Sequence, residues 1–220
     1  WLDHGPDNYA GVTWHNTAPR TVFIGWMSNW TYAKELPTSP WRSAMTLPRE
    51  LSLRRVDGQV HLSAQPAQEV LAHLQTHEAS SAPLSQGQVN WSGALREMSG
   101  RFAIELTSPT LHDFTITLSN EQGEALHLGY NQSSDTYWID RSQAGQNDFH
   151  PDFAKRHQAP RITGTQQAQI ALFFDHTCVE LFADRGLTSM TSLHFPSSPW
   201  TRLLLQTNMQ EGTAGLLPWR

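Results

Sequence analysis

Tryptophan and polar side chains that suit a sugar-binding site crowd the first 55 residues of this sequence. Trp26 and Trp30 are four residues apart, which places them on one face if they share a β-strand. Asn29 lies between them, and Asp3 and Asp7 precede them. An indole face stacks on the C–H groups of a sugar, while carboxylate and guanidinium groups bind its hydroxyls. The segment therefore has the residue types of a carbohydrate site.

The same segment also has a purely structural interpretation. Large aromatic side chains serve packing in most β-folds, so these Trp residues are candidates for a core. Arg42, Arg49 and Glu50 could likewise form a structural ion-pair network. The residue types alone leave both interpretations open.

The elements that must position these residues are mostly strands. Runs of alternating, β-branched or aromatic residues predict strands at 11–14, 21–26, 102–107, 114–119, 125–130, 136–141, 169–175, 178–183, 191–195 and 202–207. Turn signals separate them, and one helix is predicted at 66–74, with Pro66 in its first turn. Because strands do not alternate with helices, a doubly wound α/β fold is excluded. The fold class is all-β, as a sandwich, a barrel or part of a propeller.

Composition removes several classes of function. The net charge is −5 and Lys occurs only at Lys34 and Lys155, so binding of nucleic acid through a cationic face is excluded. No apolar run approaches the roughly 18 residues that span a bilayer, so no membrane span is expected. Cys178 is the only cysteine, which rules out an intrachain disulfide and Cys-cluster metal sites. His73 and His77 lack the Glu of a His-Glu-x-x-His motif, so we expect no metal and no cofactor.

Five segments resemble one enzyme family. They are residues 2–10 (LDHGPDNYA), 24–30 (IGWMSNW), 37–51 (PTSPWRSAMTLPREL), 174–184 (FDHTCVELFAD) and 191–196 (TSLHFP). Their order and spacing resemble glycoside hydrolase family 32, which comprises invertases, levanases and exo-inulinases. The resemblance is strongest to the bacterial levanase and fructan β-fructosidase branch, and it spans almost the whole chain.

The resemblance implies a five-bladed β-propeller followed by a β-sandwich. On this basis, residues 1–56 are the last part of the catalytic propeller, residues 57–81 are a linker with a short helix, and residues 82–220 are the sandwich. It also implies retaining hydrolysis of terminal β-fructofuranosyl units of levan, inulin or sucrose, by an Asp nucleophile and a Glu acid/base. Membership of this branch further implies a bacterial protein that is secreted or periplasmic.

The family's catalytic motifs are missing from the sequence. Its nucleophile lies in Asn-Asp-Pro-Asn-Gly, a second Asp lies in Arg-Asp-Pro, and the acid/base Glu precedes a Cys. Here Asp148 is followed by Phe149, and Glu180 follows Cys178 instead of preceding a Cys. We therefore expect no catalytic residue in this chain. The catalytic carboxylates would come from an N-terminal propeller portion, as a separate chain, and this chain alone would be inactive.

Family motifs also suggest roles for the N-terminal residues. Trp30 resembles the aromatic residue that walls the fructose pocket. Asp3 and Asp7 match the stretch that contacts the leaving-group side of the substrate. Trp26 and Asn29 are expected to support or contact the same sugar.

A second hypothesis is a non-catalytic carbohydrate-binding or interaction sandwich. Residues 82–220 contain aromatics that could bind a fructan or mediate dimerisation, although packing is the commoner role for such residues: Trp91, Tyr137, Trp138 and Trp200. Glu180 alternates with Val179 and Leu181 on a predicted strand, so we expect it to face solvent.

Overall fold

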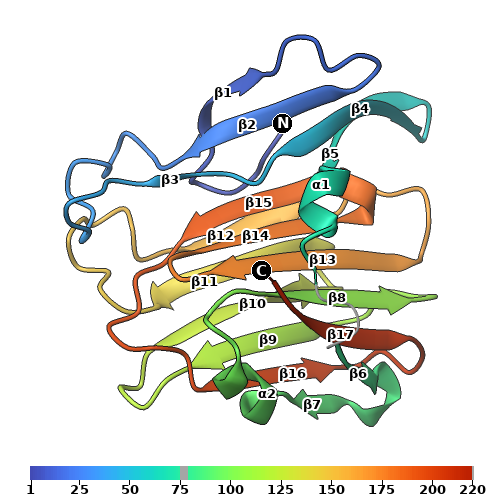
Figure 1. Ribbon diagram of the computed structural model, residues 1–220. Coiled ribbons are helices and arrows are strands. Elements are labelled where there is room, and N and C mark those ends of the chain that lie inside the picture. The colour runs from blue at the N-terminus through green and yellow to red at the C-terminus, as the bar shows by residue number, and fades with distance from the viewer. Residues whose placement is uncertain (75–78, 220) are drawn as a thin grey trace.

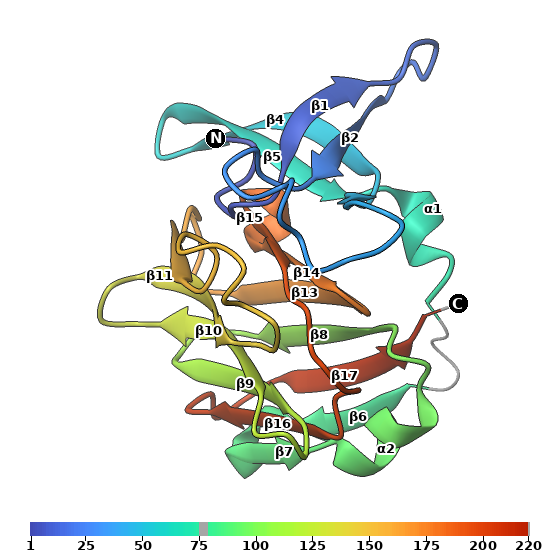
Figure 2. The ribbon, with the colours of Figure 1, turned by 90° about the vertical axis from the view of Figure 1, so that its left-hand side faces the viewer.

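The computed structural model describes residues 1–74 and 79–219 and contains three antiparallel sheets. One sheet is formed by the N-terminal part of the chain and lies across the top of the molecule (Figure 1). The other two sheets lie face to face below it and form a sandwich (Figure 2). The all-β expectation is confirmed.

The N-terminal sheet has five strands. They are β1 (Tyr9–Thr13), β2 (Thr21–Met27), β3 (Ala44–Met45), β4 (Arg49–Val56) and β5 (Gln59–Pro66). Their order is β1-β2-β4-β5, with β3 paired to β2. A two-residue turn joins β4 to β5, and both of its residues, Asp57 and Gly58, have positive φ, as a tight hairpin requires.

This hairpin extends the N-terminal sheet past the boundary expected at residue 56. The strand β5 pairs with β4 along its whole length, from Val56↔Gln59 to Arg49↔Pro66. The segment expected as a linker, residues 57–81, therefore begins with a strand of this sheet. Residues 75–78 of the expected linker lie outside the described residues.

The expected helix over 66–74 is shorter than the pattern indicated. The helix α1 comprises Gln68–Leu71, with Val70 buried. Pro66 does not begin it, because Pro66 is the last residue of β5 and pairs with Arg49. The N–H of Ala67 donates to the carbonyl oxygen of Pro48 at 2.8 Å, so the strand ladder continues up to the start of the helix.

Each sandwich sheet has six strands. The first runs β12 (Arg156–Pro160), β11 (Thr136–Gln143), β10 (Ala125–Asn131), β9 (Phe114–Ser119), β16 (Arg202–Thr207), β7 (Gln88–Asn90). The second runs β15 (Thr188–Leu193), β14 (Cys178–Ala183), β13 (Ala168–Asp175), β8 (Phe102–Ser108), β17 (Thr213–Pro218), β6 (Ser80–Pro83). A second helix, α2 (Ser92–Glu97), lies beside β16. The sandwich begins at Ser80, close to the expected boundary at residue 82.

The sandwich core follows from the period of two along each strand. In β9, Phe114, Ile116 and Leu118 are buried while the residues between them are half-buried. Phe102 of β8 and Phe174 of β13 stack with ring centroids 4.6 Å apart. Apolar side chains on the facing sides of the two sheets are thus removed from water together, which is the main favourable contribution to the fold.

Among residues 1–74 and 79–219, no helix is long and apolar enough to cross a membrane.

Replacing the core ring of Phe174 tests this account of the sandwich. We expect Phe174→Ala to lower the free energy of unfolding by about 3–5 kcal/mol, because it removes a buried ring and leaves a cavity. Leu53, which is 73% exposed on β4, offers a control. Leu53→Ala should stay within about 0.5 kcal/mol of the unaltered chain in urea unfolding. Equal losses in the two variants would contradict the core assignment.

Candidate functional site

An aromatic shelf forms where β2 ends. The rings of Trp26 and Trp30 lie with centroids 5.1 Å apart, and Tyr9 of β1 meets Trp26 edge-on at 6.3 Å. The indole N–H of Trp26 donates to Oγ of Ser43, which fixes the orientation of the Trp26 ring. Trp30 is 62% exposed, so its indole is available to a ligand. We call Tyr9, Trp26 and Trp30 the aromatic shelf.

The shelf does not arise in the way that the spacing predicted. The strand β2 ends at Met27, so Trp30 lies in the following turn and not on the same strand as Trp26. Asn29 shapes this turn: its Oδ1 accepts from the N–H of Thr31 at 2.9 Å. The side-chain amide of Asn29 donates to the carbonyl oxygen of Pro6, also at 2.9 Å. Asn29 therefore ties the turn that carries Trp30 to the segment around Pro6.

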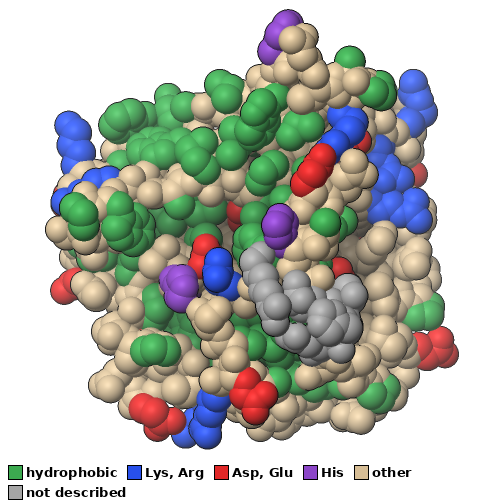
Figure 3. All heavy atoms as spheres, in the orientation of Figure 1, with side chains coloured by type: hydrophobic (Ala, Val, Ile, Leu, Met, Phe, Trp, Pro, Cys, Tyr) green, Lys and Arg blue, Asp and Glu red, His purple; other side chains and the backbone are tan. Residues whose placement is uncertain are grey.

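Hydrophobic side chains gather around the shelf on the surface of the N-terminal sheet (Figure 3). The exposed large apolar residues of β1, β2–β3 and the adjoining loops are Tyr9, Val12, Trp14, Trp30, Trp41 and Met45. Every residue of β1 is exposed, and β1 is an edge strand of its sheet. An unpaired edge beside an apolar surface is typical of a surface that another part of a protein covers.

Asp3 lies below this surface, in a buried network around Arg49. The Arg49 side chain is fully buried. Its Nη1 lies 2.7 Å from Oδ2 of Asp3, and its Nη2 lies 2.7 Å from Oε2 of Glu180 and 2.6 Å from Oγ1 of Thr191. Asp3 also accepts from the backbone N–H groups of Gly5 and Thr191, at 2.7 and 3.0 Å. Arg49 thus joins the N-terminal sheet to strands β14 and β15 of the sandwich.

The two carboxyl groups of this network differ in pKa. Burial by itself raises the pKa of Asp3, but Arg49, Thr191 and Gly5 outweigh it and hold the pKa of Asp3 below its usual range. Burial raises the pKa of Glu180, and Arg49 with the N–H of Leu47 offsets this only in part. Of the two carboxyl groups, Asp3 is therefore the one whose charged form its surroundings favour.

The position of Glu180 corrects the expectation that it faces solvent. Glu180 is only 2% exposed. The alternation along β14 does direct it away from Val179 and Leu181, but the N-terminal sheet covers that side of the strand. The N–H of Leu47 reaches Oε1 of Glu180 at 2.7 Å, and Arg49 reaches the other oxygen.

Asp7 lies in a second buried network, around Arg141 of β11. Its Oδ2 accepts from Nη1 of Arg141 at 2.5 Å and from the N–H of Leu193 at 2.8 Å, and its Oδ1 accepts from the hydroxyl of Tyr32. Nη2 of Arg141 donates to the Tyr32 oxygen at 2.9 Å. The guanidinium also lies over the ring of Phe153, 3.8 Å from its centroid. The side chains of Asp7 and Arg141 are fully buried.

These two networks separate the expected site residues into two groups. Trp26, Asn29 and Trp30 come together at the shelf. Asp3 and Asp7 lie underneath, where hydrogen bonds and ion pairs within the protein occupy both oxygens of each carboxylate. In this structure the two carboxylates hold the chain between residues 3 and 7, which is the segment that Asn29 contacts through Pro6.

Several of the other charged residues that the sequence singled out have structural contacts. Nε of Arg20 lies 2.9 Å from Oε2 of Glu50 at the surface. Arg42 donates to the carbonyl oxygen of Leu36. Sequence reasoning did not single out Arg141, although Tyr137, Ile139 and Arg141 share one face of a predicted strand. A charge in line with apolar residues indicates a buried partner.

The described residues contain no group of three or more His, Cys, Asp or Glu side chains placed to hold a metal ion. His77, which the sequence analysis considered with His73, lies outside them.

Removing the Arg49 guanidinium tests its role as the link between the sheets. Arg49→Met leaves Asp3 and Glu180 buried without a counter-charge, which should lower the free energy of unfolding by about 3–5 kcal/mol at pH 7. In the variant both carboxyl pKa values rise above those of the unfolded chain. The variant's free energy of unfolding then falls as pH rises through these pKa values. The difference in free energy of unfolding between the variant and the unaltered chain should therefore shrink as pH falls to about 4.5.

The control is Arg20→Met, which breaks two ion pairs at the surface, one with Glu50 and one with Glu69. Because water screens such pairs, we expect a much smaller effect at every pH. A deficit in Arg49→Met that does not depend on pH would contradict the proposed cause.

Comparison with known proteins agrees with this division of the chain. Residues 1–66 match the model of the glycosyl hydrolases family 32 N-terminal domain, and residues 63–216 match that of the glycosyl hydrolases family 32 C terminal. The extracellular exo-inulinase of Aspergillus niger is 32% identical over 205 residues, and the levanase of Bacillus subtilis is 31% identical over 209. These matches cover 90% and 89% of this chain, but only 38% and 30% of the two relatives.

Solved structures agree in fold. The crystal structure of exo-inulinase from Aspergillus awamori superposes with a TM-score of 0.88 at 26% identity, over 100% of this chain and 44% of that one. Fructan 1-exohydrolase IIa from Cichorium intybus, at 15% identity, shares the fold with a TM-score of 0.74 and covers 100% and 49% of the two chains. The chain belongs to glycoside hydrolase family 32, and it contains a propeller sheet followed by the family's β-sandwich.

Proposed function

We propose that this chain is the C-terminal portion of a secreted β-fructosidase that hydrolyses terminal fructose units of levan, inulin or sucrose with retention of configuration. The aromatic shelf is the observation that carries the proposal. It presents an exposed indole on a sheet that matches the end of the family's N-terminal domain. The extracellular exo-inulinase and the levanase among its relatives support the substrate class and secretion.

The shelf is built to hold one indole ring in a fixed place. Trp26, anchored by Ser43, lies beside Trp30, and Asn29 fixes the turn between them. A ring that is already ordered loses little entropy when a ligand binds. We propose that Trp30 forms the aromatic wall against fructose and that Trp26 and Asn29 position it.

The roles proposed for Asp3 and Asp7 follow from their contacts. Both carboxylates anchor the backbone between residues 3 and 7, and the carbonyl oxygen of Pro6 in that segment accepts the amide of Asn29. We propose that Asp3 and Asp7 hold this segment in place, and through it the turn that carries Trp30. On this proposal they position the substrate-binding surface and do not contact the leaving group directly.

The catalytic carboxylates are proposed to lie in an N-terminal portion of the enzyme. The chain spans less than half the length of the two curated relatives described above. The apolar surface and free β1 edge of the N-terminal sheet are the features that further propeller blades would cover. The N-terminal portion would thus supply both the reacting groups and the partner for this surface, whether it is joined to this chain or separate.

The alternative, a carbohydrate-binding or interaction sandwich, gains little from the structure. Trp91, Tyr137 and Trp138 are buried, so they pack in the sandwich and present no binding surface. Trp200 is partly buried against the same core. The shelf on the N-terminal sheet therefore remains the better-supported carbohydrate site.

Activity of the chain alone provides the first test of the proposal. Without a nucleophile and an acid, the two-step displacement cannot proceed, so we expect no fructose release from levan, inulin or sucrose. Adding the N-terminal portion should restore release, measured by chromatography of free fructose, with each portion alone as a control. Release by the purified 220-residue chain would disprove the proposed division of the active site.

The second test concerns the shelf. In the reconstituted enzyme, Trp30→Ala should lower kcat/KM by roughly 10- to 100-fold, because it removes the stacking surface for fructose. Leu53→Ala, which also removes an exposed apolar side chain from this sheet, should leave kcat/KM unchanged. An unaltered kcat/KM in Trp30→Ala would show that the shelf does not contact substrate.

A further inference from the structure

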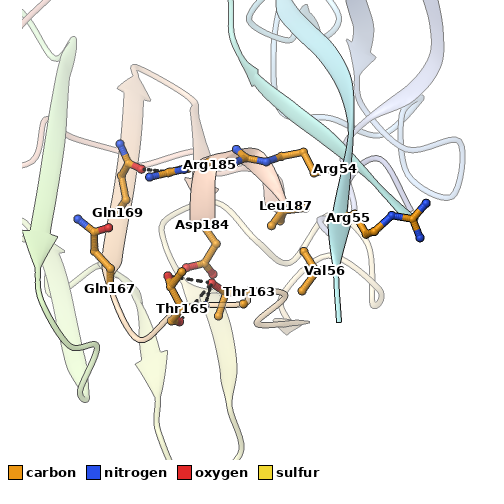
Figure 4. Close-up of a pocket in the computed structure, with 11 residues that line it drawn as sticks. Arg54, Arg55, Val56, Thr163, Thr165, Gln167, Gln169, Asp184, Arg185 and Leu187 are labelled. Carbon is orange, nitrogen blue, oxygen red and sulfur yellow. Dashed lines mark hydrogen bonds between the residues drawn. The ribbon is translucent and has the colours of Figure 1, made fainter. Parts of the chain in front are cut away.

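A pocket of about 160 Å³ lies between the N-terminal sheet and the sandwich, away from the aromatic shelf. On one side it is lined by Arg54 of β4, and on the other by Gln169 of β13 and Arg185, in the turn between β14 and β15 (Figure 4). Thr163 and Thr165 line its floor. Both parts of the molecule are thus needed to form the pocket.

Two guanidinium groups face this pocket without a counter-ion. Arg54 is partly buried, yet within the described part of the chain it has no hydrogen bond and no ion pair. The exposed side chain of Arg185 makes one hydrogen bond within the described residues, from its Nε to Oε1 of Gln169 at 3.3 Å. In the view of Figure 4 both guanidinium groups lie near one end of the pocket, Arg54 coming from β4 and Arg185 from the turn after β14. Positive charges that face one pocket without compensation favour the binding of an anion.

Asp184 is the acidic residue among the described residues that line the pocket, and it does not neutralise Arg54 and Arg185. Its side chain is buried and directed elsewhere: Oδ2 accepts from the hydroxyl of Tyr137 at 2.9 Å, and Oδ1 lies 3.5 Å from Nε of Arg161. Burial raises the pKa of Asp184 to about 6, and the contacts with Arg161 and Tyr137 offset this only in part. The charge that faces the pocket is therefore positive.

The turn that carries Arg185 is fixed against the N-terminal sheet. Arg185 has a φ of 59°, and its carbonyl oxygen accepts from Oγ of Ser63 on β5 at 2.8 Å. Gly186 follows with a φ of 77°, and a Cβ there would lie 2.4 Å from the carbonyl oxygen of Ala64. The close approach requires glycine, and it holds the backbone of Arg185 at a set distance from β4 and β5.

We propose that this pocket binds a small oxyanion, a phosphate, sulfate or carboxylate group, between the guanidinium groups of Arg54 and Arg185. Guanidinium groups suit planar, bidentate binding of such groups. The amide of Gln169 and the hydroxyl of Thr165 supply further donors, while the hydroxyl of Thr163 donates to the carbonyl oxygen of Thr165. No aromatic ring lines the described pocket, so it lacks the stacking surface of a neutral sugar site. The bound anion bridges the propeller sheet and the sandwich and stabilises their contact.

Thermal unfolding of the chain in sodium phosphate, compared with sodium chloride of equal ionic strength, tests the proposal. A ligand that binds only the folded state raises Tm, so at a concentration of about ten times its Kd phosphate should add roughly 3–6 °C. Arg54→Gln should abolish this increment, and Arg54→Lys, which keeps the charge but loses the fork of donors, should retain part of it.

Arg55→Gln is the matched control. Arg55 is the next residue of the same strand, its guanidinium points away from the pocket (Figure 4), and its Nη1 donates to the carbonyl oxygen of Gly58 at 2.7 Å. Arg55→Gln should therefore keep the full phosphate increment. The same increment in Arg54→Gln and the unaltered chain would overturn the proposal. Equal losses of the phosphate increment in Arg54→Gln and Arg55→Gln would also overturn it, because they would indicate that phosphate responds to the overall positive charge of this surface and not to a defined site.

Calorimetric titration distinguishes the source of the anion. Inorganic phosphate, fructose 6-phosphate and neutral fructose are titrated in turn into the unaltered chain and Arg54→Gln. Tighter binding of fructose 6-phosphate than of phosphate supports a phosphate ester as the ligand, and the reverse supports a free anion. Binding of fructose as tight as that of phosphate, and equally sensitive to Arg54→Gln, would show a sugar site and would overturn the assignment.

Discussion

The buried guanidinium of Arg49 is the constraint on which the arrangement of this molecule depends. It binds Asp3 from the start of the chain and Glu180 from β14, and it belongs to β4 itself. A charge this deeply buried is tolerated only when its partners surround it, so the three segments must come together or all three charges lose their compensation. Arg141 acts in the same way for Asp7, Tyr32 and Leu193. The contact between the propeller sheet and the sandwich is therefore specified by charge as well as by apolar packing.

The proposed sugar wall depends on this contact, although it lies on the surface. Asp3 and Asp7 fix the backbone around Pro6, whose carbonyl oxygen receives the amide of Asn29, and Asn29 shapes the turn that presents Trp30. An exposed indole is thereby connected through a few hydrogen bonds to strands of the sandwich. In this arrangement the sandwich holds in place the surface that is proposed to contact the sugar.

The junction between the two parts also has properties that neither part has alone. The turn Asp184–Gly186 contacts β5, and together with β4 it lines a pocket that two guanidinium groups without a counter-ion face. Arg54 and Arg185 each look like ordinary surface residues when their own sheet is considered. Only the docking of one sheet on the other directs both charges into the same space.

The family motifs and the alternation of residues were sufficient to predict the family, the all-β class and many of the strands, including β9, β10 and β14. The hairpin β4–β5 was missed even though Asp57-Gly58 is a strong turn signal between alternating runs, and the expected end of the propeller part at residue 56 falls in that turn. The period of two correctly placed Glu180 opposite Val179 and Leu181. It could not show that Glu180 is buried, because alternation determines which face of a strand a side chain occupies and not what covers that face. The same limit applies to Asp3, Asp7 and Arg141: their burial and pairing depend on contacts between residues more than 100 positions apart, which only the tertiary structure decides.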